Sequence, residues 1–126
     1  SSAKVGKGSD VGGGASILGV LSGTDGVPVT IGDNTLLGAN SCTGTSIADG
    51  CILDAGVTIL PGTKITLSEK AVAALKEINP DKEIKELMRG MDFQGVNGVH
   101  FRQNSVTGQI IAMRSTREVK LNEDLH

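Results

Sequence analysis

Apolar positions recur along this chain at intervals of six, in step with a run of glycines. The run comprises Gly32, Gly38, Gly44, Gly50, Gly56 and Gly62, and the same spacing joins Gly6 to Gly12. A period of six fits neither a helix, which repeats near 3.6 residues, nor a strand, which repeats near 2. The pattern therefore predicts a unit made of a short strand and a corner, repeated as a solenoid.

Two columns of residues accompany the glycines. The column just before each glycine reads Val5, Val11, Ile31, Leu37, Thr43, Asp49, Ala55 and Pro61. The column three residues after it reads Ser9, Ala15, Thr35, Ser41, Ile47, Leu53, Ile59 and Ile65. Large residues in one column accompany small residues in the other, as a close-packed interior of constant width would require. We therefore expect both columns to face one narrow core, with glycine at sharp corners.

The period divides the chain into three predicted parts. The coils occupy residues 1–67, with a projecting loop at 18–30 where the glycine register breaks. A helical insert follows at 68–90: one helix is capped by Ser68 and ends at Asn79, and a second, containing Ile84, Leu87 and Met88, stops at Gly90. Residues 91–126 are predicted to form a hairpin of the strands VHFRQ and QIIAM, then a short strand near Val119.

Composition narrows the possible partners. The formal net charge of −2 and the pI near 5.6 give no general attraction to nucleic acid or to an anionic membrane. No apolar run is long enough for a membrane span. The repeat starts at Val5 without a polar cap, so we expect the N-terminal half of a longer protein to be absent. Cys42 and Cys51 form no CxxC motif, which favours reduced thiols in the cytoplasm over a disulfide or metal site.

Five stretches stand out beside the glycine spacing: GSDVGGGASILGVLSG at 8–23, LLGANS at 36–41, DAGVTILPGTK at 54–64, FRQNS at 101–105 and LNEDLH at 121–126. The spacing resembles that of the hexapeptide-repeat acyltransferases, and the stretches together resemble more closely the C-terminal half of the tetrahydrodipicolinate N-succinyltransferases. The resemblance implies a left-handed parallel β-helix with roughly 18 residues per coil. It also implies a homotrimer that transfers succinyl from succinyl-CoA to ring-opened tetrahydrodipicolinate in lysine and diaminopimelate biosynthesis.

The catalytic residue is not expected within this chain. Many hexapeptide acyltransferases use a histidine on the coils, but the two histidines here, His100 and His126, lie in the predicted hairpin and at the last position. This absence also counts against a zinc-dependent carbonic anhydrase of the same fold, which needs several histidines on the coils, and no metal is predicted in this chain. The resemblance implies a catalytic glutamate upstream of these residues. Asp10 and Gly13, in the GSDVGGG stretch, are candidates to face the substrate, although Asp10 could instead bond the glycine-rich backbone.

Candidate residues for binding CoA, unlike the catalytic residue, can be named within this chain. A pantetheine arm needs a strand edge with small residues and free backbone amides. Gly38, Ala39 and Asn40, stacked against Ala55 and Gly56, are predicted to form such a strip, with Ser22 and Gly23 of the loop closing over it. Lys64 could meet the CoA phosphates or simply be solvated. Arg102 and Asn104 are cofactor candidates by resemblance.

Two other classes of function remain open at this stage. Another hexapeptide transferase, acetylating an amino sugar or amino acid, would share the coils but not the GSDVGGG and FRQNS stretches. A non-catalytic β-solenoid would be expected to carry a regular outward ladder of one residue type. The outward positions of this chain are mixed, which favours an enzyme. This part alone, without the upstream glutamate, is predicted to be inactive.

Overall fold

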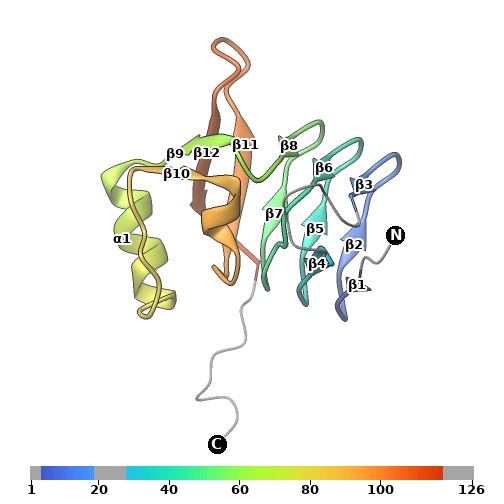
Figure 1. Cartoon of the computed structure of the whole chain (residues 1–126), viewed down its shortest axis with the longest axis horizontal. Coiled ribbons are helices and arrows are strands. Elements are labelled where there is room, and N and C mark those ends of the chain that lie inside the picture. Colours follow the sequence, from blue (N-terminus) through green and yellow to red (C-terminus); the bar gives the residue numbers. More distant parts are fainter. Residues whose placement is uncertain (1–3, 19–27, 118–126) are drawn as a thin grey trace, which may run out of the picture.

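The computed structural model describes residues 4–18 and 28–117, and these form mainly short strands with one α-helix (Figure 1). The predicted contacts of Ser22 and Gly23, most of the loop, and the strand near Val119 lie outside the described residues. The strands are β1 Lys4–Val5, β2 Asp10–Val11, β3 Ser16–Ile17, β4 Thr30–Ile31, β5 Leu36–Leu37, β6 Cys42–Thr43, β7 Ile52–Leu53, β8 Thr58–Ile59, β9 Lys64–Thr66, β10 Leu87–Arg89, β11 Val99–Gln103 and β12 Ile110–Arg114. The helices are α1 Glu69–Ile78 and the 3₁₀ helix η1 Gly90–Phe93.

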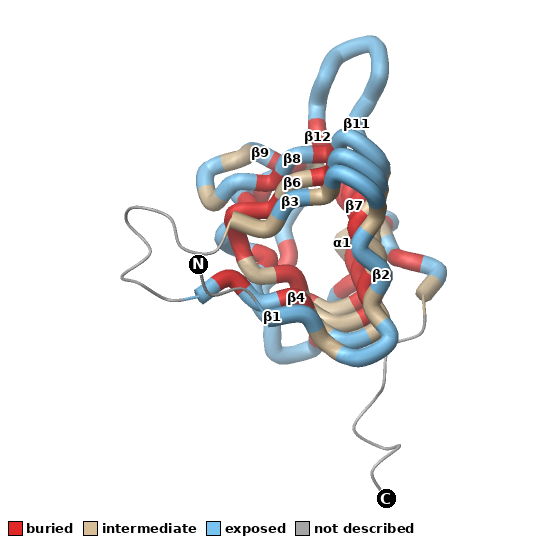
Figure 2. Tube along the Cα trace, turned by 90° about the vertical axis from the view of Figure 1, so that its right-hand side faces the viewer, coloured by how far each residue is buried: buried red, intermediate tan, exposed pale blue. Residues whose placement is uncertain are grey.

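The first eight strands stack in three parallel ladders around an apolar interior. β1 pairs with β4, β2 with β5 and then β7, and β3 with β6 and then β8. Seen along the stack, the chain passes in turn through three faces, and the buried residues line the inside (Figure 2). One passage through the three faces is called a coil below.

The coil is shorter than the predicted 18 residues. Leu37 pairs with Leu53, Cys42 with Thr58, and Ile31 with Ile47, each 16 residues further along. The two missing residues are lost at the corner after β6, where the next inward residue after Thr43 is Ile47. The Thr43 hydroxyl donates to the Thr45 carbonyl (2.6 Å) and accepts from the Thr45 N–H (3.2 Å), which closes this shorter corner internally.

This shortening corrects the interpretation of the two columns. Before the short corner the inward strand residue directly precedes the glycine, as with Leu37, which is 1% exposed. After it the inward residue follows the glycine by three, as with Leu53. The exchange of large and small residues between the two columns therefore reflects a change in register: after the short corner, the inward position moves by two residues relative to the six-residue spacing. The first column does not face the core at Asp49 and Pro61, which are half-buried, or at Ala55, which is exposed.

The first two members of that column also depart from the prediction. Val5 and Val11 are each 46% exposed. They belong to the first described coil, which packs against another described coil on one side only. Their backbone positions are inward, but no second layer of described residues closes over them.

One corner of the stack carries a repeated side-chain hydrogen bond, which we call the Asx ladder and which consists of Asp33, Asp49 and Asn97. The Oδ1 atom of Asn97 accepts from the N–H of Asp49 (3.1 Å), and Oδ1 of Asp49 accepts from the N–H of Asp33 (2.7 Å). Asp33 repeats the contact with the N–H of Lys7 (2.9 Å). A Cβ at Gly32 would stand 2.3 Å from the Asp49 oxygen, so glycine is needed there for the ladder to form.

The first predicted helix is present and the second is wrong. Ser68 caps α1 by accepting from the Ala71 N–H (3.1 Å), and the Asn79 N–H bonds the Leu75 carbonyl at the other end. Residues 87–89 instead form β10, antiparallel to β9. Only Met88 is buried there, between two exposed neighbours, which is the alternation of a strand. Pairing with the open edge of β9 outweighs a helical pattern too short to be stable alone.

The predicted hairpin is confirmed and continues the coils. β11 and β12 pair antiparallel from Val99↔Arg114 to Gln103↔Ile110, and β11 also pairs in parallel with β7. The rings of Phe93 and Phe101 meet edge to face, with centroids 5.0 Å apart, and both are 1% exposed. The only two aromatic residues of the chain thus pack against each other in the core, at the end of the stack where β11 continues the coils.

The Asx ladder leads to a test of what holds the coils in register. Asp49→Ala should lower the free energy of unfolding by about 1 kcal/mol, because the Asp33 N–H loses its acceptor. Asp49→Asn should cost less than about 0.5 kcal/mol, since Asn97 makes the same contact through an amide oxygen. Urea unfolding followed by circular dichroism measures both changes. Equal losses in the two variants would show that the charge of Asp49, rather than its acceptor oxygen, matters.

The two cysteines, both free, should differ in reactivity. Cys51 is 1% exposed, and burial raises the pKa of its thiol to about 12. Cys42 is half-exposed on β6. A disulfide reagent at pH 8 should modify one thiol in the folded chain and two in urea. Rapid modification of both folded thiols would contradict the buried position of Cys51.

The burial of Cys51 should also make the free energy of unfolding depend on pH. The unfolded Cys51 thiol ionises near its ordinary pKa of 9.0. The contribution of the buried thiol to the free energy of unfolding should therefore be complete below pH 9 and be lost as the pH rises toward 12.

Candidate functional site

The small residues predicted to meet pantetheine come together on one edge of the stack. Three corners lie above one another there, formed by residues 12–14, 38–40 and 54–56, and we call them the corner strip. The Asn40 N–H donates to the Gly13 carbonyl (2.9 Å), and the Gly56 N–H donates to the Ala39 carbonyl (2.9 Å). With the 16-residue coil, Ala39 lies beside Ala55. The strip assembles the predicted residues Gly13, Gly38, Ala39, Asn40, Ala55 and Gly56.

Glycine is required where these corners approach each other. A Cβ at Gly12 would stand 2.8 Å from the Ala39 nitrogen, and one at Gly38 would stand 2.6 Å from the Ala55 nitrogen. Both distances are shorter than atoms can tolerate, so side chains are excluded by the packing of the coils. The outward positions Gly13, Ala39, Ala55 and Gly56 are exposed. The result is an edge with little side-chain bulk and an accessible backbone.

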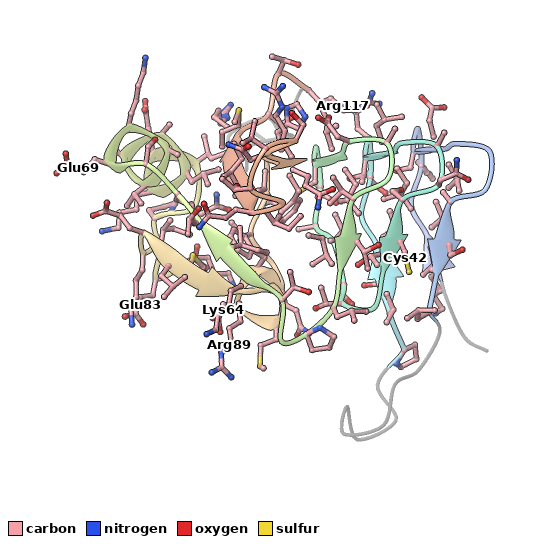
Figure 3. The ribbon with its side chains drawn as sticks, turned by 90° about the horizontal axis from the view of Figure 1, so that it is seen from above. Cys42, Lys64, Glu69, Glu83, Arg89 and Arg117 are labelled. Atoms are coloured by element: carbon pink, nitrogen blue, oxygen red, sulfur yellow. The ribbon has the colours of Figure 1, made fainter. Side chains whose placement is uncertain are left out.

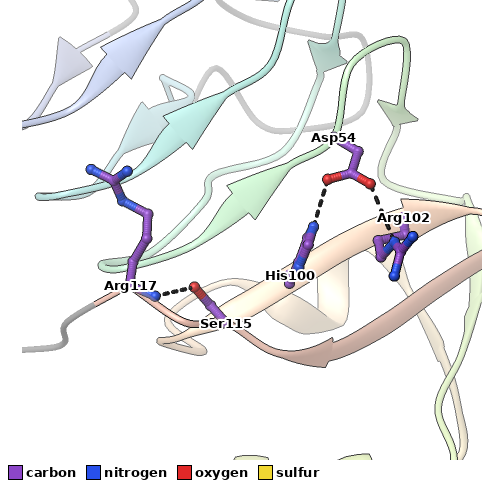
Figure 4. A network of polar contacts seen from close by, with 5 residues as sticks. All are labelled: Asp54, His100, Arg102, Ser115 and Arg117. Atoms are coloured by element: carbon purple, nitrogen blue, oxygen red, sulfur yellow. Dashed lines mark hydrogen bonds and ion pairs between the residues drawn. The ribbon is translucent and has the colours of Figure 1, made fainter.

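A charged cluster stands beside this edge (Figure 4). Asp54, which directly precedes Ala55, contacts two cationic or ionisable side chains from β11. Its Oδ1 lies 2.5 Å from Nε2 of His100, and its Oδ2 lies 3.3 Å from Nε of Arg102. The parallel pairing of β11 with β7, through Phe101↔Leu53, brings these residues together.

Asp54 orients Arg102 and leaves donors of its guanidinium available for another ligand. The ion pair with Asp54 is made through Nε, and the Arg102 side chain is 53% exposed. A guanidinium held through Nε can still present its two terminal amino groups to an anion. The sequence placed His100 in the predicted hairpin, away from the coils, and Asp54 was not singled out as a site residue. Its position in the DAGV corner, beside the predicted strip, is the signal that could have marked Asp54.

The other predicted site residues lie as follows. Asn104 is used locally, since its Oδ1 accepts from the N–H groups of Val106 (2.8 Å) and Thr107 (3.1 Å) in the hairpin turn. Asp10 is exposed on β2, and its carboxylate makes no hydrogen bond to any described residue. The proposed bond to the glycine-rich backbone is therefore not seen. Lys64 lies on β9 rather than in a corner of the strip, and it is the register partner of Arg89 on β10 (Figure 3).

A contact between Arg117 and Asn34 was not predicted from the sequence. The Arg117 guanidinium donates through Nε to the Asn34 carbonyl (2.7 Å) and through Nη2 to the Asn34 Oδ1 (2.8 Å). The Arg117 N–H bonds the Ser115 hydroxyl (2.9 Å), as Figure 4 shows. This arrangement fixes the last described residues against a corner of the coils, 83 positions away in sequence.

The described residues contain neither a candidate metal cluster nor a candidate membrane-spanning helix. Among residues 4–18 and 28–117, no group of three or more His, Cys, Asp or Glu side chains is arranged to hold a metal ion. Over the same ranges, no helix is both long and apolar enough to cross a membrane.

Comparison with known proteins adds to this geometry. The family model described as the hexapeptide repeat of succinyl-transferase matches residues 28–61. A 2,3,4,5-tetrahydropyridine-2,6-dicarboxylate N-succinyltransferase of Sulfurovum sp. is 66% identical over the whole chain, and the chain spans 32% of that protein. Proteins of the same name from Helicobacter pylori and Vibrio cholerae are 52% and 41% identical, over 100% and 97% of the chain. The chain spans 32% and 33% of them.

A solved structure agrees with the sequence comparison. It comes from Campylobacter jejuni and is named as a 2,3,4,5-tetrahydropyridine-2-carboxylate N-succinyltransferase. The match has a TM-score of 0.83 and 51% identity, and it covers 90% of this chain and 30% of the other. The resemblance inferred from the sequence motifs is thereby confirmed. Over its whole length the chain is similar to proteins named 2,3,4,5-tetrahydropyridine-2,6-dicarboxylate N-succinyltransferase, and it spans about a third of the length of these relatives.

Proposed function

We propose that this chain is the part of an N-succinyltransferase that binds the acyl donor, succinyl-CoA. The observation that carries the proposal is the identity of 66% over the whole chain to a relative of that name. The corner strip supports it, because its exposed backbone suits the amides of a pantetheine arm. The acceptor would be the amine of ring-opened tetrahydrodipicolinate, in lysine and diaminopimelate biosynthesis.

The reaction requires three events. The amine must lose its proton, its nitrogen must attack the thioester carbonyl, and the carbon–sulfur bond must break so that CoA leaves as a thiol. In this proposal the base is a glutamate upstream of these residues. The chain described here contributes binding and alignment, with the corner strip along the pantetheine and Arg102, held by Asp54, facing an anionic group of either substrate. Asp10 and Gly13 would face the acceptor.

The same proposal covers architecture and assembly. We infer a left-handed β-helix, because the matching family model describes hexapeptide repeats. We also infer a homotrimer in the cytoplasm, in which neighbouring subunits and the upstream part of the protein complete each site. A core with only two aromatic residues gains little per residue, so contacts between subunits would add needed stability.

Assay of the full-length protein tests the proposed reaction. With tetrahydrodipicolinate as acceptor, the loss of thioester absorbance should show a kcat/KM for succinyl-CoA at least about 10-fold above that for acetyl-CoA, since the extra carboxylate needs a matched partner. Light scattering should give the mass of a trimer, and the 126-residue chain alone should be inactive. Equal use of the two thioesters would favour a general acyltransferase, and a stable monomer would contradict the assembly.

A single substitution tests the corner strip. Ala39→Trp in the full-length protein should abolish measurable binding of CoA, because the indole would fill the path of the pantetheine. The melting temperature should change little, since Ala39 is exposed. Ala73→Trp, at an exposed position of α1, is the matched control and should bind CoA normally. Calorimetry measures both affinities, and unimpaired binding by Ala39→Trp would remove this residue from the site.

A further inference from the structure

The hairpin of β11 and β12 extends beyond the stack as a two-stranded ribbon, and we call its end, residues 103–109, the arm. β11 pairs with β7 only through His100 and Phe101, and β12 pairs with β9 only through Ile110 and Ile111. Residues 103–109 are all exposed. Figures 1 and 2 both show the arm standing out from the stack, with no other described element beside its tip.

The arm is held in one shape by its own hydrogen bonds. The Asn104 N–H donates to the Gln109 carbonyl (2.8 Å), and the Gly108 N–H donates to the Asn104 carbonyl (2.7 Å). The Gln103 side-chain amide donates to the Gly108 carbonyl (3.1 Å). Val106, at the tip, is 91% exposed. An arm ordered in this way can present Val106 to another surface with little further loss of conformational entropy.

The arm lacks the features that protect an exposed ribbon. Exposed strand edges usually carry charged side chains, lysine above all, or proline, which prevent pairing with another chain. The arm reads QNSVTGQ and has neither, although 21% of the residues of the chain are charged. Charged residues are depleted in the core of protein interfaces, and a two-stranded ribbon by itself is only marginally stable in water. The composition and exposure of the arm therefore favour docking on another surface.

The surface that receives the arm is not supplied by the described part of the same chain, since Val106 is left exposed there. An upstream part of the protein would connect through Lys4, next to β2, whereas β11 lies three positions from β2 in the sheet. A second copy of the chain is the remaining occupant. A projecting arm and the surface that it meets are different parts of one subunit, and such a heterologous contact can close into a ring.

We propose that the arm docks on a neighbouring subunit of the same protein, with Val106 as the apolar anchor of the contact. This inference rests on the proposed function, which includes a homotrimer, and adds to it the segment that joins one subunit to the next. Burial of the valine side chain would supply the apolar part of the contact. The backbone groups along the outer edges of the arm would supply its polar part.

A crosslinking experiment on the full-length protein identifies the occupant. The photoreactive amino acid p-benzoylphenylalanine is placed at Val106, and the purified protein is irradiated. Covalent dimers and trimers should appear on a denaturing gel, and peptide mapping should locate the receiving surface on the second copy. The same amino acid at Ala73, an exposed position of α1, is the matched control and should leave the subunits uncrosslinked.

A charge at the tip tests the anchor. Val106→Asp should raise the dissociation constant of the assembly at least about 10-fold, because the contact would bury a carboxylate without a partner. Ala73→Asp adds the same charge elsewhere on the surface and should leave the dissociation constant unchanged. Mass photometry over a dilution series measures both. Circular dichroism should show that both variants keep the folded coils, since both positions are exposed in the subunit.

Each outcome decides between the alternatives. Crosslinks confined to one chain would place the arm on its own subunit and overturn the proposal. The absence of crosslinks, an unchanged dissociation constant in Val106→Asp, or an equal loss in Ala73→Asp would also overturn it. A trimer that uses succinyl-CoA without crosslinking through the arm would refute this contact and keep the proposed function. Subunits that crosslink through the arm in a protein that does not use succinyl-CoA would do the reverse.

Discussion

Backbone hydrogen bonds between successive coils set the position of every other feature in this structure. The Gly12 N–H bonds the Leu37 carbonyl (2.7 Å), and the Gly38 N–H bonds the Leu53 carbonyl (2.8 Å). Such bonds draw neighbouring corners so close that a Cβ at either glycine would collide with the next coil. The strip of accessible backbone on which the proposed pantetheine contact depends is therefore a consequence of how the coils pack. The stability of the stack and the proposed binding surface come from the same constraint.

The 16-residue coil determines which residues become neighbours. An 18-residue coil would place Gly38 beside Gly56, whereas the shorter coil places it beside Asp54. Asp54 then stands at the point where β11 joins β7, within reach of His100 and Arg102. The charged cluster at the strip thus depends on the short corner that contains Gly44 and Thr45. This corner has two residues fewer than the six-residue spacing would give. That corner is possible because Thr43 supplies a donor and an acceptor locally.

Sequence reasoning succeeded where the signal was local and failed where it was not. The cap at Ser68, the stop at Asn79 and the hairpin around Asn104 are encoded within a few residues, and they were placed correctly. The shift in register could not be seen in the sequence, because the spacing of six between glycines continues unbroken. What changes is the place of each glycine relative to its strand. Gly38 directly follows a strand, whereas Gly56 occupies the turn at φ 77°, where Asn40 stands at φ 58° one coil earlier. The pairings of His100 with Asp54 and of Arg89 with Lys64 join distant segments, so no window of sequence contains them.

The two groups of charged side chains differ in a way that bears on ligand binding. At the corner strip Asp54 contacts His100 and already balances part of the charge of Arg102, so a ligand there would meet directed donors more than a strong positive field. Lys64 and Arg89 have no such balance within the described chain, and their attraction for an anion would act over a Debye length of about 8 Å at physiological salt. The two groups would therefore act on a ligand over different ranges. The corner strip offers directed contacts at short range, whereas the cations of β9 and β10 act mainly through their charge.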